Sequence, residues 1–395
     1  MKRFCALLLA FLLLCPAALA AHYEGYTMDG LLPIAVYPID SHTVVARCWP
    51  WNWRSSEMIA APNTLIWLRD GQTVRSMNYY LRGATGDLDN TSFLSDGQGG
   101  FRVLLHRKTG VKTVSDGGET GQETVTYQST LYDWTEEGLQ NPVDLPDGWH
   151  YLPCSTLVAA WREADTLVEI RLLDLQGNAF YSSVLPGTAG HALQSVWPWP
   201  GGYLIRTQAS GVSSVTCVEN GQVRWQTTPV QEWDFFPDGA GGFFTVAGNR
   251  NGSYEPPVVI HYGADGRQDM QKVLNGDRLV KQIQGCVRDE ETGRTLLYGY
   301  AVANSRRVYT VFRLTLDQHM NLVSQDVREL DAAYRDYSPR VYLTPDGFPW
   351  VLTWAAGVDG SHASLPPAIV PFDSLPVSTA ASLTWQEAQA PYRVE

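Results

Sequence analysis

A unit of four short strands recurs about seven times along the chain, and this repeat limits the possible folds more than any other feature. Each unit opens with an apolar strand and a tight Gly/Asp turn. A strongly apolar strand and a variable polar loop follow, then two alternating strands joined by an Asp-Gly or Asn-Gly type turn. Such turns are strong hairpin signals, because a two-residue turn with the right twist needs positive φ angles.

The clearest copy of the unit lies between residues 233 and 274. Its first turn is Asp238-Gly239-Ala240-Gly241-Gly242, and its last turn is Asp265-Gly266. The second strands of the units begin 40 to 57 residues apart, near Val44, Phe101, Leu157, Tyr203, Phe243, Thr295 and Phe348. A four-strand period of this length is typical of propeller blades. No stretch shows a 3.6-residue periodicity of helical length.

We therefore predict an all-β chain whose residues 21–395 form a single β-propeller of about seven four-stranded blades. A solenoid or a pair of β-sandwiches would also contain many short strands, but the recurrence of a whole four-strand unit favours the propeller. Residues 378–385 are the expected last strand of the seventh blade, and residues 32–39 either open the first blade or help to close the seventh. The expected blades lie near residues 30–81, 92–145, 148–187, 193–230, 233–274, 283–330 and 338–385.

The fourth unit resembles the blades of quinoprotein-like propellers. In that family a turn glycine is followed, four residues on, by a tryptophan that docks between blades, and here Gly221 precedes Trp225 at that offset. The other turns place Arg75, Tyr181 and Met270 there, so the resemblance covers one blade. The Trp-Asp dipeptide that closes WD40 blades is missing. The resemblance implies the fold, and no quinone or other cofactor is expected.

The N-terminus predicts an export signal over residues 1–20. Lys2 and Arg3 precede an apolar run from Cys5 to Cys15, and small residues lead to a cleavage site that ends at Ala20. The run is shorter than the roughly 20 residues that span a bilayer. We expect cleavage and a secreted, extracellular chain without membrane insertion; a retained anchor is the alternative.

Charge and cysteine spacing exclude several classes of function. After the signal is removed, 27 basic residues face 41 acidic ones, which argues against nucleic acid and anionic membranes as partners. Cation binding or neutral polymers such as glycans remain compatible. The mature cysteines are too widely spaced for a metal finger. We expect them to be small buried hydrophobic residues in strands, although two disulfides are the alternative. These cysteines are Cys48, Cys154, Cys217 and Cys286.

The sequence contains no recognisable catalytic or metal-binding motif. There is no H-E-x-x-H, no G-x-S-x-G and no phosphate-binding glycine loop. Asp87-Leu88-Asp89-Asn90 looks like the start of a calcium loop, but it lacks the glycine and the distal glutamate of an EF-hand. Paired carboxylates for glycoside chemistry cannot be identified, because their pairing is spatial. No metal site is expected.

Tryptophan clusters and long loops supply the candidate ligand-binding residues. Flat indole rings stack on sugars, although tryptophans also wedge between blades. One cluster, at residues 49–53, follows a second strand and should share a face with the long second-to-third-strand loops. The other, Trp197 and Trp199, ends a first strand and should lie on the opposite face. The candidate residues on the long-loop face are Trp49, Trp51, Trp53, Arg107, Arg250 and Arg306.

Three hypotheses for the function remain. The first is a secreted, monomeric, non-enzymatic binding or scaffold propeller that presents its long-loop face to a protein or glycan. The second is an extracellular carbohydrate-active enzyme, which two carboxylates plus an Arg or Tyr at the channel mouth would favour. The third is an envelope assembly factor, which would need an exposed apolar patch on a blade edge.

Overall fold

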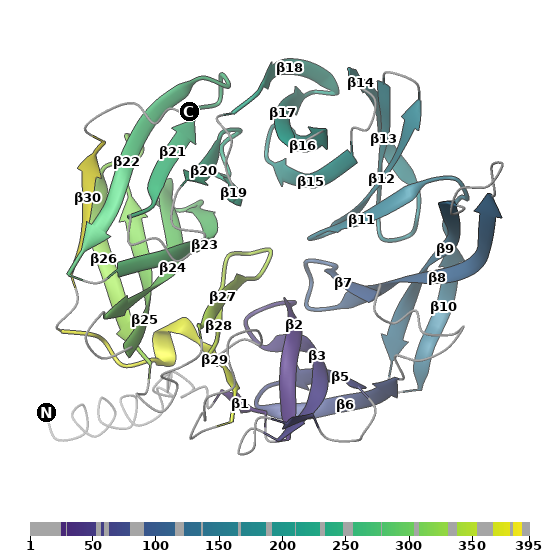
Figure 1. Ribbon diagram of the computed structural model, residues 1–395, viewed down its shortest axis with the longest axis horizontal. Helices are drawn as coiled ribbons and strands as arrows, with labels where there is room; N and C mark the ends of the chain where they lie inside the picture. Colours follow the sequence, from purple (N-terminus) through teal and green to yellow (C-terminus); the bar gives the residue numbers. More distant parts are fainter. Residues whose placement is uncertain are drawn as a thin grey trace, which may run out of the picture.

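The described strands form seven antiparallel sheets around a central axis, so the chain is a seven-bladed β-propeller, as the repeat predicted (Figure 1). The computed structural model describes residues 25–388 with internal gaps. The gaps are residues 29, 53–56, 59–62, 80–90, 115–121, 136, 165–166, 187–191, 210, 230–233, 248–255, 278, 304–307, 331–337, 354–365 and 380–381.

The first four blades follow one another in chain order, each with its first strand beside the central channel (Figure 1). A short strand, β4 (Glu57–Met58), pairs with the end of β3. Blade 1 holds β2 (Leu31–Pro38), β3 (Thr43–Asn52), β5 (Asn63–Arg69) and β6 (Gln72–Tyr79). Blade 2 holds β7 (Thr91–Ser95), β8 (Phe101–Val114), β9 (Gln122–Thr135) and β10 (Gly138–Asp144). Blade 3 holds β11 (His150–Cys154), β12 (Leu157–Ala164), β13 (Leu167–Leu173) and β14 (Ala179–Pro186). Blade 4 holds β15 (Ala192–Trp199), β16 (Gly202–Ala209), β17 (Val212–Glu219) and β18 (Gln222–Thr227).

The last three blades include both ends of the described chain. Blade 5 holds β19 (Asp234–Pro237), β20 (Phe243–Ala247), β21 (Val258–Tyr262) and β22 (Gln268–Gly276), with β30 (Leu383–Glu387) as a fifth strand. Blade 6 holds β23 (Leu279–Asp289), β24 (Arg294–Ala303), β25 (Val308–Leu316) and β26 (Leu322–Glu329). Blade 7 holds β27 (Arg340–Leu343), β28 (Pro349–Leu352), β29 (Ala368–Pro371) and, from the N-terminal end, β1 (Tyr26–Thr27). A single turn of 3-10 helix, η3 (Phe372–Ser374), follows β29.

Aspartate side chains hold several of the short turns within the blades. In four of these turns one carboxylate oxygen accepts the backbone N–H groups two and four residues further on, at 2.7 to 2.9 Å. A tight turn leaves such N–H groups without partners, and a short acidic side chain satisfies them locally. The four residues are Asp96, Asp174, Asp238 and Asp317.

In several blades a long side chain donates a hydrogen bond to a turn carbonyl of the following blade. The indole N–H of Trp225 donates to the carbonyl of Ala264 in blade 5 at 2.7 Å, so this tryptophan docks between blades as its resemblance implied. Arg102 reaches the carbonyl of Leu175 in blade 3 at 2.6 Å. The indole of Trp350 in blade 7 donates to Asp40 of blade 1 at 3.0 Å. These contacts fasten the turns on one face of the ring to one another.

The ring is closed by β1, which lies antiparallel to β29 with Tyr26 opposite Ile369. The hydroxyl of Tyr26 donates to the His42 carbonyl at 3.1 Å and accepts the N–H of Gly71 at 3.3 Å, and both partners belong to blade 1. The ring of Tyr26 lies against Trp350, with 5.8 Å between the centroids. The two-residue strand therefore joins the last blade to the first. Residues 32–39 instead form most of β2 and open blade 1.

The expectation that residues 378–385 complete blade 7 is wrong. This segment passes along the outer strand of blade 6, where Ser378 N–H donates to Val327 at 2.7 Å, and then pairs with β22 of blade 5. The Trp385 indole donates to the Met320 carbonyl in blade 6 at 3.0 Å. The physical reason is that β1 already occupies the edge of blade 7. In Figure 1 the yellow β30 accordingly lies beside the green β22.

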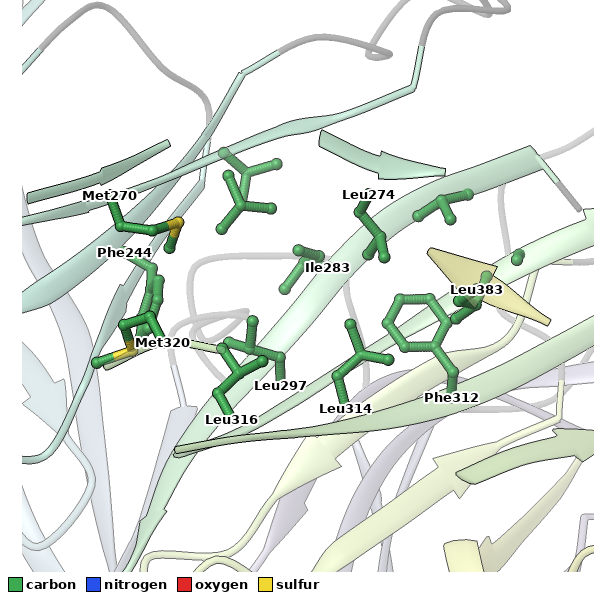
Figure 2. Close-up of a cluster of buried hydrophobic side chains, with 14 of the residues drawn as sticks. Phe244, Met270, Leu274, Ile283, Leu297, Phe312, Leu314, Leu316, Met320 and Leu383 are labelled. Carbon is green, nitrogen blue, oxygen red and sulfur yellow. The ribbon is translucent and has the colours of Figure 1, made fainter. Parts of the chain in front are cut away.

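The core divides into clusters of buried apolar side chains, each lying between two adjacent blades. The cluster between blades 5 and 6 joins Phe244, Ile283 and Phe312, and Leu383 from β30 closes one side of it (Figure 2). The four cysteines are free and lie in four different strands, as expected. Burial raises the pKa of Cys154 to about 12 and of Cys217 to about 11.

We expect Leu383→Ala to lower the free energy of unfolding by about 2–5 kcal/mol, because it leaves a cavity between blades 5 and 6. Leu383 is 3% exposed. The measurement is urea unfolding followed by tryptophan fluorescence. Val377→Ala is the control, since Val377 belongs to the same segment but is 61% exposed. Equal stability of the two variants would contradict the docking of β30.

Candidate functional site

The direction of the strands sorts the connections onto two faces of the propeller. The turns between first and second strands, and between third and fourth strands, open on one face, called here the short-turn face. The second-to-third-strand loops and the links between blades open on the other, the long-loop face. The first face carries the aspartate-capped turns, so its surface is built from short, hydrogen-bonded connections.

Only part of the predicted long-loop site lies among the described residues. Trp49 and Trp51 are half-buried in β3, opposite Leu32 and Met58 respectively. Arg107 is in β8, but its side chain is outside the described part. Trp53, Arg250 and Arg306 also lie outside it. Whether these residues form a ligand site therefore stays a prediction.

The second tryptophan cluster lies at the opposite ends of the strands. Trp199 is paired with Gly202 at the first turn of blade 4, whereas Trp49 is near the loop end of β3. The two clusters thus belong to different faces, because β15 ends at the short-turn face and β3 ends at the long-loop face. Trp197 and Trp199 are therefore available only to a site on the short-turn face.

A cavity of about 1010 Å³ opens at the channel on the short-turn face, and we call it the channel-mouth cavity. The first-to-second-strand turns of blades 3 to 7 line it. One lining residue from each turn is Ser155, Pro200, Gly239, Asp289 and Asp346. Because consecutive turns come from separate blades, the cavity exists only when these blades are assembled side by side.

Two half-buried tryptophans form the aromatic part of the wall. Trp199 lies over the glycines of two neighbouring turns: a Cβ added at Gly201 would be 2.0 Å from its ring, and one added at Gly241 would be 3.2 Å from it. Gly241 also has a φ of 90°, a conformation that side chains disfavour. Trp199 is therefore wedged between blades 4 and 5, and Trp197 lies beside it on the same side of β15.

Carboxylates outnumber cations in the cavity wall. Among the described lining residues, Asp289, Glu290, Glu291 and Asp346 are acidic and Arg288 alone is basic. Asp289 accepts the Thr292 hydroxyl at 2.6 Å, and this hydrogen bond is the main reason that its pKa is lowered. Asp346 accepts the hydroxyl of Thr344. Glu290 and Glu291 are exposed at the tip of the turn. This wall is therefore negatively charged near neutral pH.

Behind the wall, a buried histidine contacts the turn between β19 and β20 of blade 5 through Asp238. His261 in β21 is 3% exposed; its Nε2 lies 3.1 Å from Asp238 Oδ2, and its Nδ1 lies 2.6 Å from Asp269 Oδ1. Burial by itself would lower the pKa of His261. The hydrogen bonds and charges of Asp238 and Asp269 outweigh that effect and raise the pKa to about 9. The ion pair between His261 and Asp238 thus holds the turn that contains the lining residues Pro237 and Gly239.

A smaller cavity of about 410 Å³ lies between blades 1, 2 and 3 on the same face. Trp67, Phe101 and Trp134 form its aromatic side. Its guanidinium groups are engaged within the fold, because Arg102 contacts Asp133 at 3.0 Å and Arg69 donates to the Gly99 carbonyl at 3.0 Å. This cavity is accordingly an interblade contact region with its cations already paired.

Sequence reasoning missed the channel-mouth cavity. Its five turns are spread over residues 155–347, so no local pattern marks them as one site. The described residues contain no group of three or more His, Cys, Asp or Glu able to hold a metal ion. Asp87 and Asp89 lie outside the described part. Among the described helical residues, none forms a segment long and apolar enough to cross a membrane.

Comparisons with known proteins give only distant likenesses. No protein-family model and no curated protein matches the chain. A prolyl endopeptidase structure matches with a TM-score of 0.47 at 13% identity, over 96% of this chain and 53% of the other. TolB from Acinetobacter baumannii matches with a TM-score of 0.35 at 14% identity, over 84% of this chain and 81% of TolB. This chain thus spans about half the length of the prolyl endopeptidase.

We expect the stability contributed by His261 to depend on pH. A pKa raised from about 6.5 to about 9 stabilises the fold fully below pH 6.5, and this contribution is lost as the pH rises through 9. The free-energy difference between the parent and His261→Gln should therefore shrink by about 3 kcal/mol between pH 6 and pH 9.5.

The measurement is urea unfolding of both proteins across this pH range. Taking the difference between them removes the contributions of groups that titrate in both, such as the buried cysteines. A difference that stays constant with pH would contradict the ion pair.

Proposed function

We propose that this chain is an exported, non-enzymatic binding protein whose partner occupies the channel-mouth cavity. The observation that carries the proposal is the cavity itself: about 1010 Å³, walled by the turns of five blades. This volume is at the upper end of the roughly 300–1,000 Å³ range of ligand pockets. Half-buried indoles and a few charged groups supply the mixture of apolar and polar lining typical of such sites.

Rigidity of the lining supports a binding role. Asp238 caps its own turn through Ala240 and Gly242 and is joined to His261, so that part of the wall is fixed before any partner arrives. A site that is ordered in advance loses less conformational entropy on binding, and affinity rises accordingly. The long-loop face, with Trp49 and Trp51, remains a second predicted surface for a protein or glycan.

A carbohydrate-active enzyme is the second candidate, because carboxylates and Arg288 do gather at the channel mouth. Glycoside hydrolysis needs a general acid with a raised pKa beside an ionised partner. Asp289 has a lowered pKa and is bound to its own turn through Thr292. The described lining residues include no histidine to serve as an alternative acid. Binding without turnover is therefore the better supported function.

We expect Trp197→Ala to abolish the binding of partners at the channel-mouth cavity. The test is a thermal-shift screen of residues 21–395 with basic, neutral and acidic hexapeptides and with cello-, chito- and galacturono-oligosaccharides. A ligand at 100 times its dissociation constant stabilises the folded state by about 2.7 kcal/mol, which gives a measurable shift. Phe180→Ala is the control, since Phe180 is an aromatic residue that is 51% exposed on β14 and does not line the cavity.

Different outcomes separate the candidates. A shift lost in Trp197→Ala and kept in Phe180→Ala supports binding at the cavity. A shift lost only in a Trp49→Ala/Trp51→Ala variant would move the site to the long-loop face. Release of reducing sugar from an oligosaccharide, lost on replacing Glu290 and Glu291 by glutamine, would establish the enzyme instead.

A further inference from the structure

We infer that the channel-mouth cavity recognises the basic side chains of a peptide segment, arginine above all; this inference rests on the proposed function. Three features of the lining converge on that chemistry. They are an excess of carboxylates, indole rings in the same lining, and a volume larger than a single side chain requires.

The negative charge of the rim is available to a ligand. Glu290 and Glu291 are exposed, and the described residues give neither of them an ion-pair partner. Asp289 has its pKa lowered through Thr292 and stays ionised well below neutral pH. Among the described lining residues Arg288 is the only basic one, and its stem lies near Gly239 in the turn of the neighbouring blade 5. The described lining therefore carries a net negative charge.

The indoles of Trp197 and Trp199 line the same cavity from blade 4, and an indole face suits a planar cation. A guanidinium stacks on an indole face and simultaneously donates two hydrogen bonds to a carboxylate, which an ammonium does less well. The chain already uses this stacking elsewhere, since the guanidinium groups of Arg162 and Arg171 lie 4.6 and 4.3 Å from the ring centre of Trp149. At the channel mouth, Trp197 and Trp199 have no such cation from the chain itself among the described cation–π pairs.

The size and charge of the cavity disfavour other ligands. A metal ion needs several ligand atoms that converge on it, and the described residues contain no group of three His, Cys, Asp or Glu side chains able to hold one. Anionic sugars, phosphates and nucleic acid are repelled by the rim and by a chain that carries an excess of acidic residues. About 1010 Å³ also exceeds what one free amino acid or a linear polyamine would fill. A peptide with several basic side chains matches both the volume and the charge.

The test uses a matched pair of probes, the blocked peptide Ac-(Gly-Arg)3-NH2 and its citrulline twin, in which a neutral group of the same shape replaces each guanidinium. Spermine is the third probe. Isothermal titration with the mature chain should show binding of the arginine peptide and at least about tenfold weaker binding of the citrulline peptide. The affinity for the arginine peptide should fall as salt rises from 50 to 200 mM.

Variants locate the binding. The double variant Glu290→Gln/Glu291→Gln should bind the arginine peptide at least about tenfold more weakly than the parent, because two exposed rim charges are lost. The control variant Glu137→Gln/Glu163→Gln removes the same charge from exposed positions outside the lining. Its affinity for the arginine peptide should stay within about twofold of that of the parent. Trp197→Ala should lower the affinity both for the arginine peptide and for any neutral ligand of the cavity. All three proteins should keep the parent far-UV circular dichroism.

The remaining outcomes overturn the inference in distinguishable ways. Equal binding of the citrulline peptide, or full affinity in Glu290→Gln/Glu291→Gln, overturns the basic-peptide inference; the proposed function survives if Trp197→Ala still abolishes that binding. Spermine binding more tightly than the arginine peptide overturns the choice of a peptide. Binding of a neutral oligosaccharide alone, sensitive to Trp197→Ala, also overturns the inference but keeps the site. Binding of no probe, peptide or sugar, at the cavity removes both proposals.

Discussion

The pairing of β1 with β29 is the constraint on which the rest of the molecule depends. Among the described residues, each buried apolar cluster lies between two adjacent sheets, so the blades share their cores. The last and first blades can bury their facing surfaces only when the ring is complete. Tyr26 secures that junction twice, by strand pairing with Ile369 and by hydrogen bonds to His42 and Gly71 of blade 1. Closure also sets the positions of the turns that surround the channel.

A second device stiffens the short-turn face. Trp225, Trp350 and Arg102 each donate from one blade to a turn carbonyl of the next, and aspartates cap several of those turns from within. Such contacts satisfy backbone groups that would otherwise be left unpaired, so they position the turns as well as stabilise them. The channel-mouth cavity is built on this face. Its shape is consequently a property of the whole ring and of no single blade.

The charge of the cavity depends on which carboxylates are hydrogen-bonded within their own turns and which are not. Asp238 and Asp289 are committed to their own turns, through Gly242 and Thr292, whereas Glu290 and Glu291 project from the tip of a turn. The committed carboxylates hold their own turns in place, and the exposed ones are the charges that the proposed partner would contact. The ion pair of Asp238 with His261 lies just behind, so protonation of one buried imidazole bears on the rigidity of the wall.

The sequence by itself determined the repeat, the turn chemistry and the opposite placement of the two tryptophan clusters, because each follows from local alternation and turn residues. The resemblance of the fourth unit to quinoprotein-like blades implied that Trp225 docks between blades, as it does. Only the tertiary structure decided that residues 383–387 join blade 5, since an apolar strand carries the same local pattern whichever edge it pairs with. Likewise, His261 contacts Asp238 across 23 residues of sequence, and the turns at Ser155 and Asp346 line one cavity although they belong to blades 3 and 7. The first of these contacts depends on the assembly of blade 5 and the second on the arrangement of the blades around the channel, and no local pattern encodes either.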